Sequence, residues 1–122
     1  MSATNIALTS TISEDNTLEL ALREIDIPQP GENQIVIRVE AAPINPSDLG
    51  VMFSVADMTT AKQSGSAERP VIHAEVPAKF MGAVEKRLGK AIPVGNEGAG
   101  TVVAAGSSAA AQSLMGKTVA FI

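Results

Sequence analysis

The residues of this chain that could carry chemistry are concentrated in three short segments. They are Ala42-Pro43-Ile44-Asn45-Pro46-Ser47-Asp48, then Gly95-Asn96-Glu97-Gly98-Ala99-Gly100-Thr101-Val102-Val103, and finally Gly116-Lys117-Thr118-Val119-Ala120. The amide of Asn45 offers both a hydrogen-bond donor and an acceptor, so it can bind a polar ligand. It can equally begin a turn before Pro46, because Asn-Pro is common turn chemistry. Both interpretations stay open.

Ser47, Asp48 and Glu97 are further side chains of these segments whose oxygens could contact a ligand. Ser47 and Asp48 either join a ligand site or cap one or two helical turns over residues 47–54. Capping is the favoured interpretation, because a side-chain oxygen at that position can accept a free backbone N–H. Glu97 is either a buried carboxylate bonded to neighbouring backbone or a residue that lines a cleft, and the sequence does not choose between the two.

The glycines of the second segment raise the question of a phosphate-binding loop. A dinucleotide fingerprint needs Gly-x-Gly-x-x-Gly between a strand and a helix. Here Gly95, Gly98 and Gly100 have the spacing Gly-x-x-Gly-x-Gly, and a β-rich Thr-Val-Val follows. The pattern therefore predicts close backbone packing in a strand or bulge.

The first half of the chain reads as strands and turns. Residues 6–12 form a short apolar run, and from Thr17 the leucines alternate with Glu19, Ala21 and Arg23. This period of two is typical of a half-buried strand, and Glu14-Asp15-Asn16 between the two runs predicts a β-hairpin. After a Pro- and Gly-rich turn at 28–33, residues 34–39 alternate again and give the clearest strand of the sequence.

The second half mixes loops, helices and strands. Residues 57–70 are polar and read as a loop. From 78 to 88, Phe80, Val84 and Leu88 recur every four residues, which predicts a short amphipathic helix that ends at Gly89. Further elements are expected as a strand at 100–105, a helical turn within 107–115 and a final strand at 117–122. The pattern alone supports a mainly β fold, a small barrel or sandwich.

Composition excludes several classes of protein. The chain has 122 residues, which fits one domain, and 45% of them are hydrophobic against 18% charged, as in a globular protein. The net charge of −4, the scattered basic residues and the lack of Trp and Tyr argue against binding to nucleic acid or to an anionic membrane. We identify no signal peptide and no membrane-spanning stretch, so the expected location is the cytoplasm.

Metal and thiol chemistry is poorly supported by the sequence. The chain contains no Cys, which excludes disulfides, thiolate zinc sites and cysteine nucleophiles, and which fits a reducing compartment. His73 is the single histidine. One imidazole does not make a metal site, so we interpret His73 as a histidine of a surface loop.

The order of the segments resembles that of the medium-chain dehydrogenase/reductase superfamily, in its N-terminal GroES-like domain. Pro30-Gly31-Glu32 before an Ile-Val-Ile-Arg-Val strand is a fourth matching feature. The Asn-Pro-Ser-Asp form is similar to the zinc-free quinone oxidoreductase and enoyl reductase branch. Residues 30–50 and 93–120 carry the resemblance, and 51–92 match poorly. One such motif is a weak signal, but four in the same order are fairly specific.

This resemblance implies a fold and a chemistry. The fold is a GroES-like, partly open β-barrel with one or two short helices. The cofactor is NADPH or NADH, and the reaction passes a hydride to a quinone or an activated carbon–carbon double bond. Asn45, Ser47 and Asp48 are the implied cofactor-binding residues, and no catalytic residue is assigned. Enoyl reductases of the branch use a Tyr that this chain lacks, which ranks quinone or enone reduction higher.

The same resemblance bears on metal. Zinc-binding members of the superfamily carry Cys and His ligands where this chain has Asn45 and Asn96. Amide oxygens are poor substitutes for thiolate or imidazole ligands, so we expect no zinc.

The resemblance further implies an incomplete domain. The family carries its cofactor on a Rossmann domain, which would follow residue 122, so residues 1–122 are expected to be an N-terminal fragment with an atypical insertion at 55–92. The fragment alone is expected to be inactive, to bind no cofactor and to form a homodimer through the apolar strand at 117–122. The alternative is a stand-alone GroES-like binding or assembly module without catalysis.

Overall fold

The computed structural model of this protein describes residues 4–122 as a series of strands with short helices between them. In chain order the elements are β1 (Thr4–Ile12), β2 (Thr17–Asp26), β3 (Ile35–Ala41), α1 (Pro46–Phe53), β4 (Asp57–Gly65), β5 (Pro70–Glu75), α2 (Ala78–Val84), the 3-10 turn η1 (Glu85–Arg87), β6 (Ile92–Pro93), β7 (Gly98–Ala105), α3 (Ala109–Gln112) and β8 (Thr118–Phe121).

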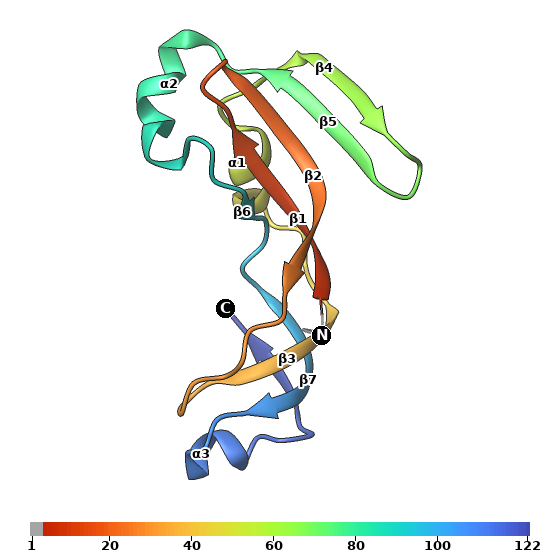
Figure 1. Ribbon diagram of the computed structural model, residues 1–122, viewed down its shortest axis with the longest axis vertical. Helices are drawn as coiled ribbons and strands as arrows, with labels where there is room; N and C mark the ends of the chain where they lie inside the picture. Colours follow the sequence, from red (N-terminus) through yellow and green to blue (C-terminus); the bar gives the residue numbers. More distant parts are fainter. Residues whose placement is uncertain (1–3) are drawn as a thin grey trace. The chain divides into compact units, whose positions relative to one another are not determined.

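The strands build two open sheets. One has the order β4-β5-β2-β1-β6 and the other has the order β3-β7-β8 (Figure 1). Neither sheet closes on itself within residues 4–122, and the helices are few and short. The predicted fold class, mainly β and partly open, is therefore confirmed.

The chain forms two compact units. The first contains Asp26–Ile44 and Gly95–Ile122, and the second contains Thr4–Ile25 and Asn45–Val94. We call them the C-terminal unit and the central unit. The assignment of the whole chain to one domain stays a prediction, and each unit is described by itself below.

The central unit is built on the predicted β1–β2 hairpin. Asn16 has a positive φ of 63°, which Asn tolerates better than most residues, and the Ser13 N–H donates to the Thr17 carbonyl at 2.9 Å. The inward side chains of Ile12, Leu18 and Leu20 are almost fully buried. With Val76 and Val84 they form the main hydrophobic cluster of the described chain.

The polar segment 57–70, predicted to be a loop, instead forms strand β4 and the turn that joins β4 to β5. β4 pairs antiparallel with β5, from Lys62 opposite His73 to Gly65 opposite Pro70. Nearly every residue of β4 is exposed, so no apolar alternation marks it as a strand. Its regular structure comes from main-chain pairing at a sheet edge, which leaves no trace in a hydrophobic pattern.

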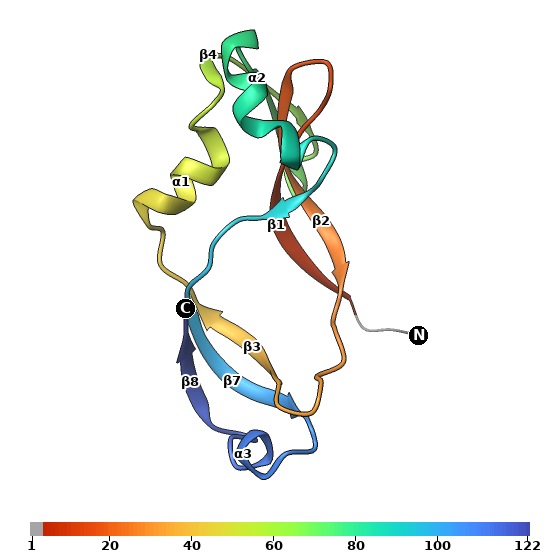
Figure 2. The same ribbon diagram turned by 90° about the vertical axis from the view of Figure 1, so that its left-hand side faces the viewer.

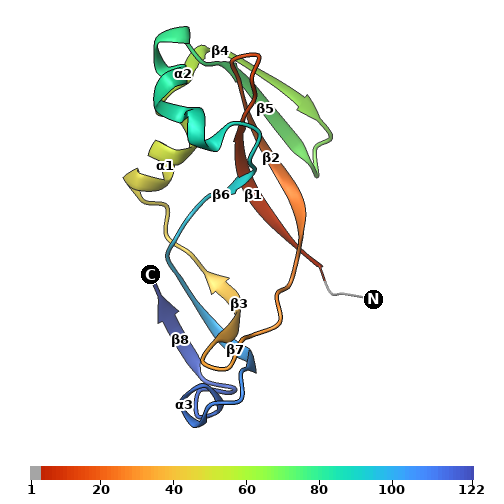
Figure 3. The same cartoon turned by 60° about the vertical axis from the view of Figure 1, so that its left-hand side comes forward.

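The predicted helix at 78–88 is present, but it is divided. α2 ends at Val84, η1 follows, and Gly89 has the positive φ of 69° expected after a helix end. Val84 is buried, and Leu88 and Met81 pack against the hydrophobic cluster. α2 lies beside the β1–β2 hairpin (Figure 3). Phe80, the first residue of the predicted apolar repeat, is 38% exposed.

The C-terminal unit is the three-stranded sheet with α3 in the connection from β7 to β8 (Figure 2). β7 is its central strand, and of the three glycines selected from the sequence, the predicted close packing is confirmed at the two that lie in β7, Gly98 and Gly100. A Cβ on Gly100 would lie 2.0 Å from the Arg38 carbonyl oxygen, and one on Gly98 would lie 2.6 Å from Cζ of Phe121. Gly95 meets no atom within 4 Å and has a φ of +91°.

No helix in the described residues is both long enough and apolar enough to cross a lipid bilayer.

Candidate functional site

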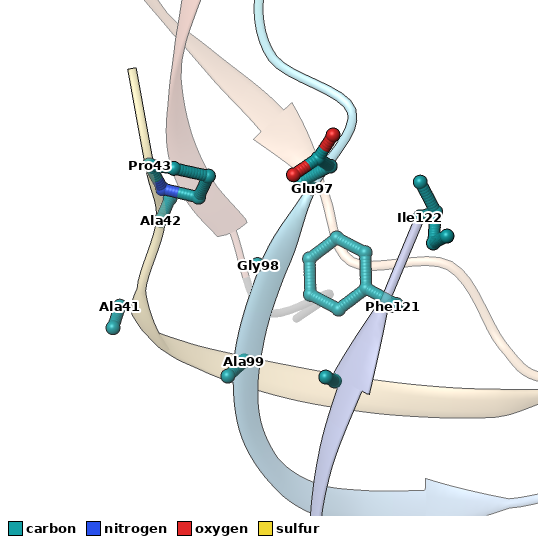
Figure 4. A pocket seen from close by; sticks show the side chains of 9 residues that line it. Ala41, Ala42, Pro43, Glu97, Gly98, Ala99, Phe121 and Ile122 are labelled. Atoms are coloured by element: carbon teal, nitrogen blue, oxygen red, sulfur yellow. The ribbon is translucent and has the colours of Figure 1, made fainter. Parts of the chain in front are cut away.

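A hollow of about 540 Å³ lies in the C-terminal unit, open to solvent (Figure 4). Its lining comes from three stretches of chain, and each stretch belongs to or directly adjoins one of the three segments selected from the sequence. The lining residues are Ala41, Ala42, Pro43, Glu97, Gly98, Ala99, Ala120, Phe121 and Ile122. We call this hollow the β7 pocket.

Strand pairing brings these stretches together. On one side of β7, Ala99 lies opposite Ala41 of β3, and on the other side Gly98 lies opposite Phe121 of β8. Gly98 is buried and lacks a side chain, which leaves room for the Phe121 ring beside β7 (Figure 4). Any larger residue at 98 would displace this ring.

The pocket is apolar with one ionisable group. Glu97 is exposed and is the single charged side chain among the lining residues. Of the two alternatives left open for Glu97, the structure selects the residue that lines a cleft. Ala, Pro and Phe side chains supply the remaining surface, so the pocket can hold a flat apolar group and place a carboxylate at its edge.

The second candidate place is the turn before α1, in the central unit. Asn45 is the N-cap residue of α1, and its backbone N–H donates to Oδ2 of Asp48 at 2.8 Å in a capping-box arrangement. The prediction that Ser47 or Asp48 is the N-cap residue is therefore wrong, because Asn45 is the N-cap. Asp48, the third helical residue, accepts the N–H of that cap. Pro46 occupies the first helical position, where its missing N–H costs nothing.

The three residues proposed to bind cofactor differ in what they can still offer. Asp48 is only 7% exposed, and its carboxylate already accepts the Asn45 N–H. Ser47 is exposed on the first turn of α1. The side-chain Nδ2 of Asn45 is shielded from solvent and has no hydrogen-bond partner in the described part of the chain. A shielded donor without a partner fits a ligand that brings an acceptor oxygen.

Other sequence candidates lie elsewhere. His73 was predicted in a surface loop, but it is in β5, opposite Glu19 of β2, with its Nε2 3.9 Å from Glu19 Oε2. Asn96 is exposed just before β7. Within residues 4–122, no three His, Cys, Asp or Glu side chains are grouped so that they could hold a metal ion. The absence of zinc stays a prediction.

A second hollow, of about 490 Å³, lies in the central unit and is acidic, with Asp15, Asp57 and Glu75 in its lining. The hydroxyl of Ser13 lowers the pKa of Asp15, with a further contribution from Thr17. Thr59 lowers the pKa of Asp57 through its hydroxyl, at 2.6 Å, and its N–H, at 3.0 Å. The carboxylates of Asp15 and Asp57 are satisfied by their own turns, so we do not treat the hollow as a ligand site.

Comparison with known proteins adds no identification: no protein-family model and no curated protein matches this chain. The pocket residues that lie outside the segments selected from the sequence are Ala41, Phe121 and Ile122. Phe121 was expected only as part of an apolar edge strand. The signal that points to all three is their position next to the selected segments.

Proposed function

We propose that this chain is the substrate-side domain of a zinc-independent, NAD(P)H-dependent oxidoreductase that reduces quinones or activated double bonds. The observation that carries the proposal is that the β7 pocket is lined by Ala42 and Pro43 of the first selected segment, residues 97–99 of the second and Ala120 of the third, together with residues that directly adjoin them. Motifs that match a family in order but scatter in space would have little meaning. Here residues 41–43, 97–99 and 120–122 line one apolar hollow.

The pocket suits a flat, uncharged ring. Phe121 and Pro43 supply apolar surfaces against which a quinone ring can lie, and small alanines leave space between them. When bound, NAD(P)H supplies the hydride, and the protein's task is to position the acceptor. A quinone needs no acid–base pair in the protein to accept that hydride, which agrees with a lining that carries a single carboxylate.

Asn45 is the residue of the central unit that fits the cofactor. Its unpartnered Nδ2 can donate to an acceptor such as the carboxamide oxygen of a nicotinamide. Ser47 stays a proposed contact because it is exposed, and Asp48 acts through the Asn45 turn that it holds. The Rossmann fold that would bind the pyrophosphate is expected outside residues 1–122, so we expect no saturable NADPH binding by this chain below about millimolar concentration.

The test of the pocket is a titration of the isotope-labelled chain with a small, stable quinone, followed by NMR. We expect saturable shifts at the amides of Gly98, Ala99 and Phe121, and a dissociation constant raised about tenfold or more by Gly98→Ala, because the new Cβ displaces the Phe121 ring. Gly82→Ala is the matched control, since nothing lies within 4 Å of a Cβ there. Absence of pocket shifts up to millimolar quinone would contradict the proposal.

The alternative function is a stand-alone binding or assembly module. The observation in its favour is that the pocket lining contains no catalytic pair and no metal ligand set. Sequencing the gene beyond the codon for Ile122 distinguishes the oxidoreductase domain from the stand-alone module. A Gly-x-Gly-x-x-Gly fingerprint on a βαβ pattern within about sixty residues after Ile122 supports the oxidoreductase, and a stop codon there supports the module.

The remaining parts of the proposal follow from composition. The ligand is a small molecule rather than nucleic acid or a membrane, because the net charge is −4 and basic residues are scattered. A cytoplasmic location agrees with the absence of Cys.

A further inference from the structure

We propose that β8 is an interface strand. Two copies of this chain pair along the outer edges of β8 in antiparallel order, centred on Ala120, so that their β3-β7-β8 sheets become one continuous sheet. This inference does not depend on the reaction proposed above. It rests on the chemistry of the sheet edges and on the direction of the free backbone groups of β8.

The edge strands of the described sheets are β4, β6, β3 and β8, and three of them carry features that discourage pairing. β4 contains Lys62 and has an irregular register with β5. β6 has two residues, one of which is Pro93. β3 carries Arg38 and Glu40 and has two register shifts against β7. Short length, charge, proline and bulges are the devices that protect a sheet edge from further pairing.

β8 carries none of these devices. Its sequence is Thr-Val-Ala-Phe, without charge or proline, and its register with β7 is regular over the whole strand. Among the edges of the described sheets, this is the one that is chemically ready to accept another strand.

The backbone geometry defines which groups of β8 are free. The Val102 N–H donates to the Lys117 carbonyl at 3.0 Å, so the main chain of Lys117 faces β7. In an antiparallel pair the facing direction alternates along the strand. Val119, opposite Gly100, and Phe121, opposite Gly98, therefore also face β7. The N–H and C=O groups of Thr118 and Ala120 point to the open side.

A second copy matches this edge because the free groups are arranged symmetrically about Ala120. A two-fold axis at that residue sets Ala120 opposite the partner's Ala120 and Thr118 opposite the partner's Ile122. Each of these pairs can exchange two main-chain hydrogen bonds. A two-fold arrangement also closes on itself, so pairing stops at a dimer.

The side chains agree with the same register. Val119 and Phe121 lie on one face of β8 and are half-buried, whereas Thr118 and Ala120 on the other face are exposed. The two-fold axis sets Val119 opposite the partner's Phe121. An aromatic side chain directly across from a β-branched one stabilises an antiparallel pair. Because Phe121 lines the β7 pocket, the partner's Val119 would extend a wall of that pocket.

The absence of Cys in this chain allows a direct test of the register. A disulfide needs Cα atoms about 4.4–6.8 Å apart, and an antiparallel non-hydrogen-bonded pair is separated by about 4.5 Å. We expect a mixture of Val119→Cys and Phe121→Cys chains to form mixed disulfide dimers about tenfold faster than either variant alone. Ser64→Cys, on the exposed β4 edge, is the control for random collision.

A second experiment tests the free backbone groups without relying on thiols. Proline at residue 120 removes an N–H that points away from β7, a position that tolerates proline in an edge strand. We expect Ala120→Pro to keep the far-UV circular dichroism of the wild type and to weaken dimerisation about tenfold or more in sedimentation equilibrium.

Three outcomes would overturn the proposal. One is a strictly monomeric wild type at several hundred micromolar. That result is also the one expected if β8 pairs with an extended peptide of a different protein instead of with a second copy. Another is an unchanged dimer in Ala120→Pro. The last is mixed Val119→Cys and Phe121→Cys cross-linking no faster than that of Ser64→Cys. If Ala120→Pro fails to fold, the cross-linking rates alone decide.

Discussion

At the scale of single residues, one surface carboxylate carries a defined electrostatic environment. Glu40 of β3 accepts from the Thr101 hydroxyl at 2.9 Å and from Arg38 Nη2 at 3.2 Å. The Thr101 hydrogen bond is the largest single cause, and Arg38 adds a hydrogen bond and its positive charge; together they hold the pKa of Glu40 below its usual value. Because Thr101 lies on β7, the contact joins two neighbouring strands of the C-terminal unit.

The first prediction concerns the pKa of Glu40. Thr101→Val and Arg38→Gln should each raise it towards the ordinary glutamate value, because each removes a group that favours the charged carboxylate. A lowered pKa adds stability that is present above the ordinary pKa and is lost as pH falls through the lowered one. Thr101→Val should therefore lose less folding stability on acidification than the wild type does. NMR titration of the Glu40 carboxyl carbon measures the shift, and an unchanged Glu40 pKa in Thr101→Val would contradict this assignment.

The second prediction concerns Ser10, which is fully buried in β1. Its hydroxyl donates to the Val51 carbonyl at 3.2 Å and accepts from Arg87 Nη2 at 2.9 Å. Ser10→Ala leaves both groups without this partner and should lower the free energy of unfolding by about 1–3 kcal/mol. Urea denaturation measures the loss, and Ser64→Ala on the exposed β4 edge should stay within about 0.5 kcal/mol of the wild type.

Sequence reasoning found Asn45 but not Ser10, and the reason is the distance along the chain to each residue's partners. The Asn45 turn is local, because its capping partner Asp48 is three residues away. Ser10 gains its role from Val51 and Arg87, which are 41 and 77 residues away. No local pattern encodes contacts of that separation.

At the scale of elements, apolar period was a good guide where a strand has a buried face and failed where it has none. Leu18 and Leu20 in β2 are buried and mark their strand, as predicted. β4 exposes both faces, so the same criterion gave a loop. β6 has only two residues, which is too short for any period. β4 and β6 are thus strands that are held by main-chain pairing.

The third prediction belongs to the packing of β3 on β7. A Cβ on Gly100 would lie 2.0 Å from the Arg38 carbonyl oxygen, a backbone atom that cannot rotate away. Gly100→Ala should therefore force the two strands apart and cost about 3 kcal/mol or more. The matched control is Gly82→Ala in α2, where nothing lies within 4 Å and alanine favours helix. Thermal unfolding of both variants checks the contrast, and equal melting temperatures would contradict it.

At the scale of the whole molecule, buried apolar side chains are distributed unevenly between the two units. The main hydrophobic cluster, with Ile12, Leu18 and Leu20 at its centre, lies entirely in the central unit. The C-terminal unit buries Val102 and Ala111 and otherwise relies on strand pairing. The composition gives the overall number of apolar residues. It could not predict that most of the buried apolar side chains would lie in the central unit.

The last prediction follows from this uneven core. Since burial of apolar area dominates stability, amides of β7 should exchange with solvent at a lower opening free energy than amides of β2. Leu18→Ala removes a fully buried side chain from the central unit and should lower the opening free energy of β2 amides by about 2–5 kcal/mol.

Native-state hydrogen exchange by NMR can follow both strands in one experiment. We expect Leu18→Ala to leave β7 amides within about 0.5 kcal/mol of the wild type, and Val102→Ala, in β7 itself, to affect the C-terminal unit in the same selective way. Equal losses of protection in β2 and β7 for both variants would mean that the chain unfolds as one cooperative body, and the distribution of buried side chains would then not decide the order of opening.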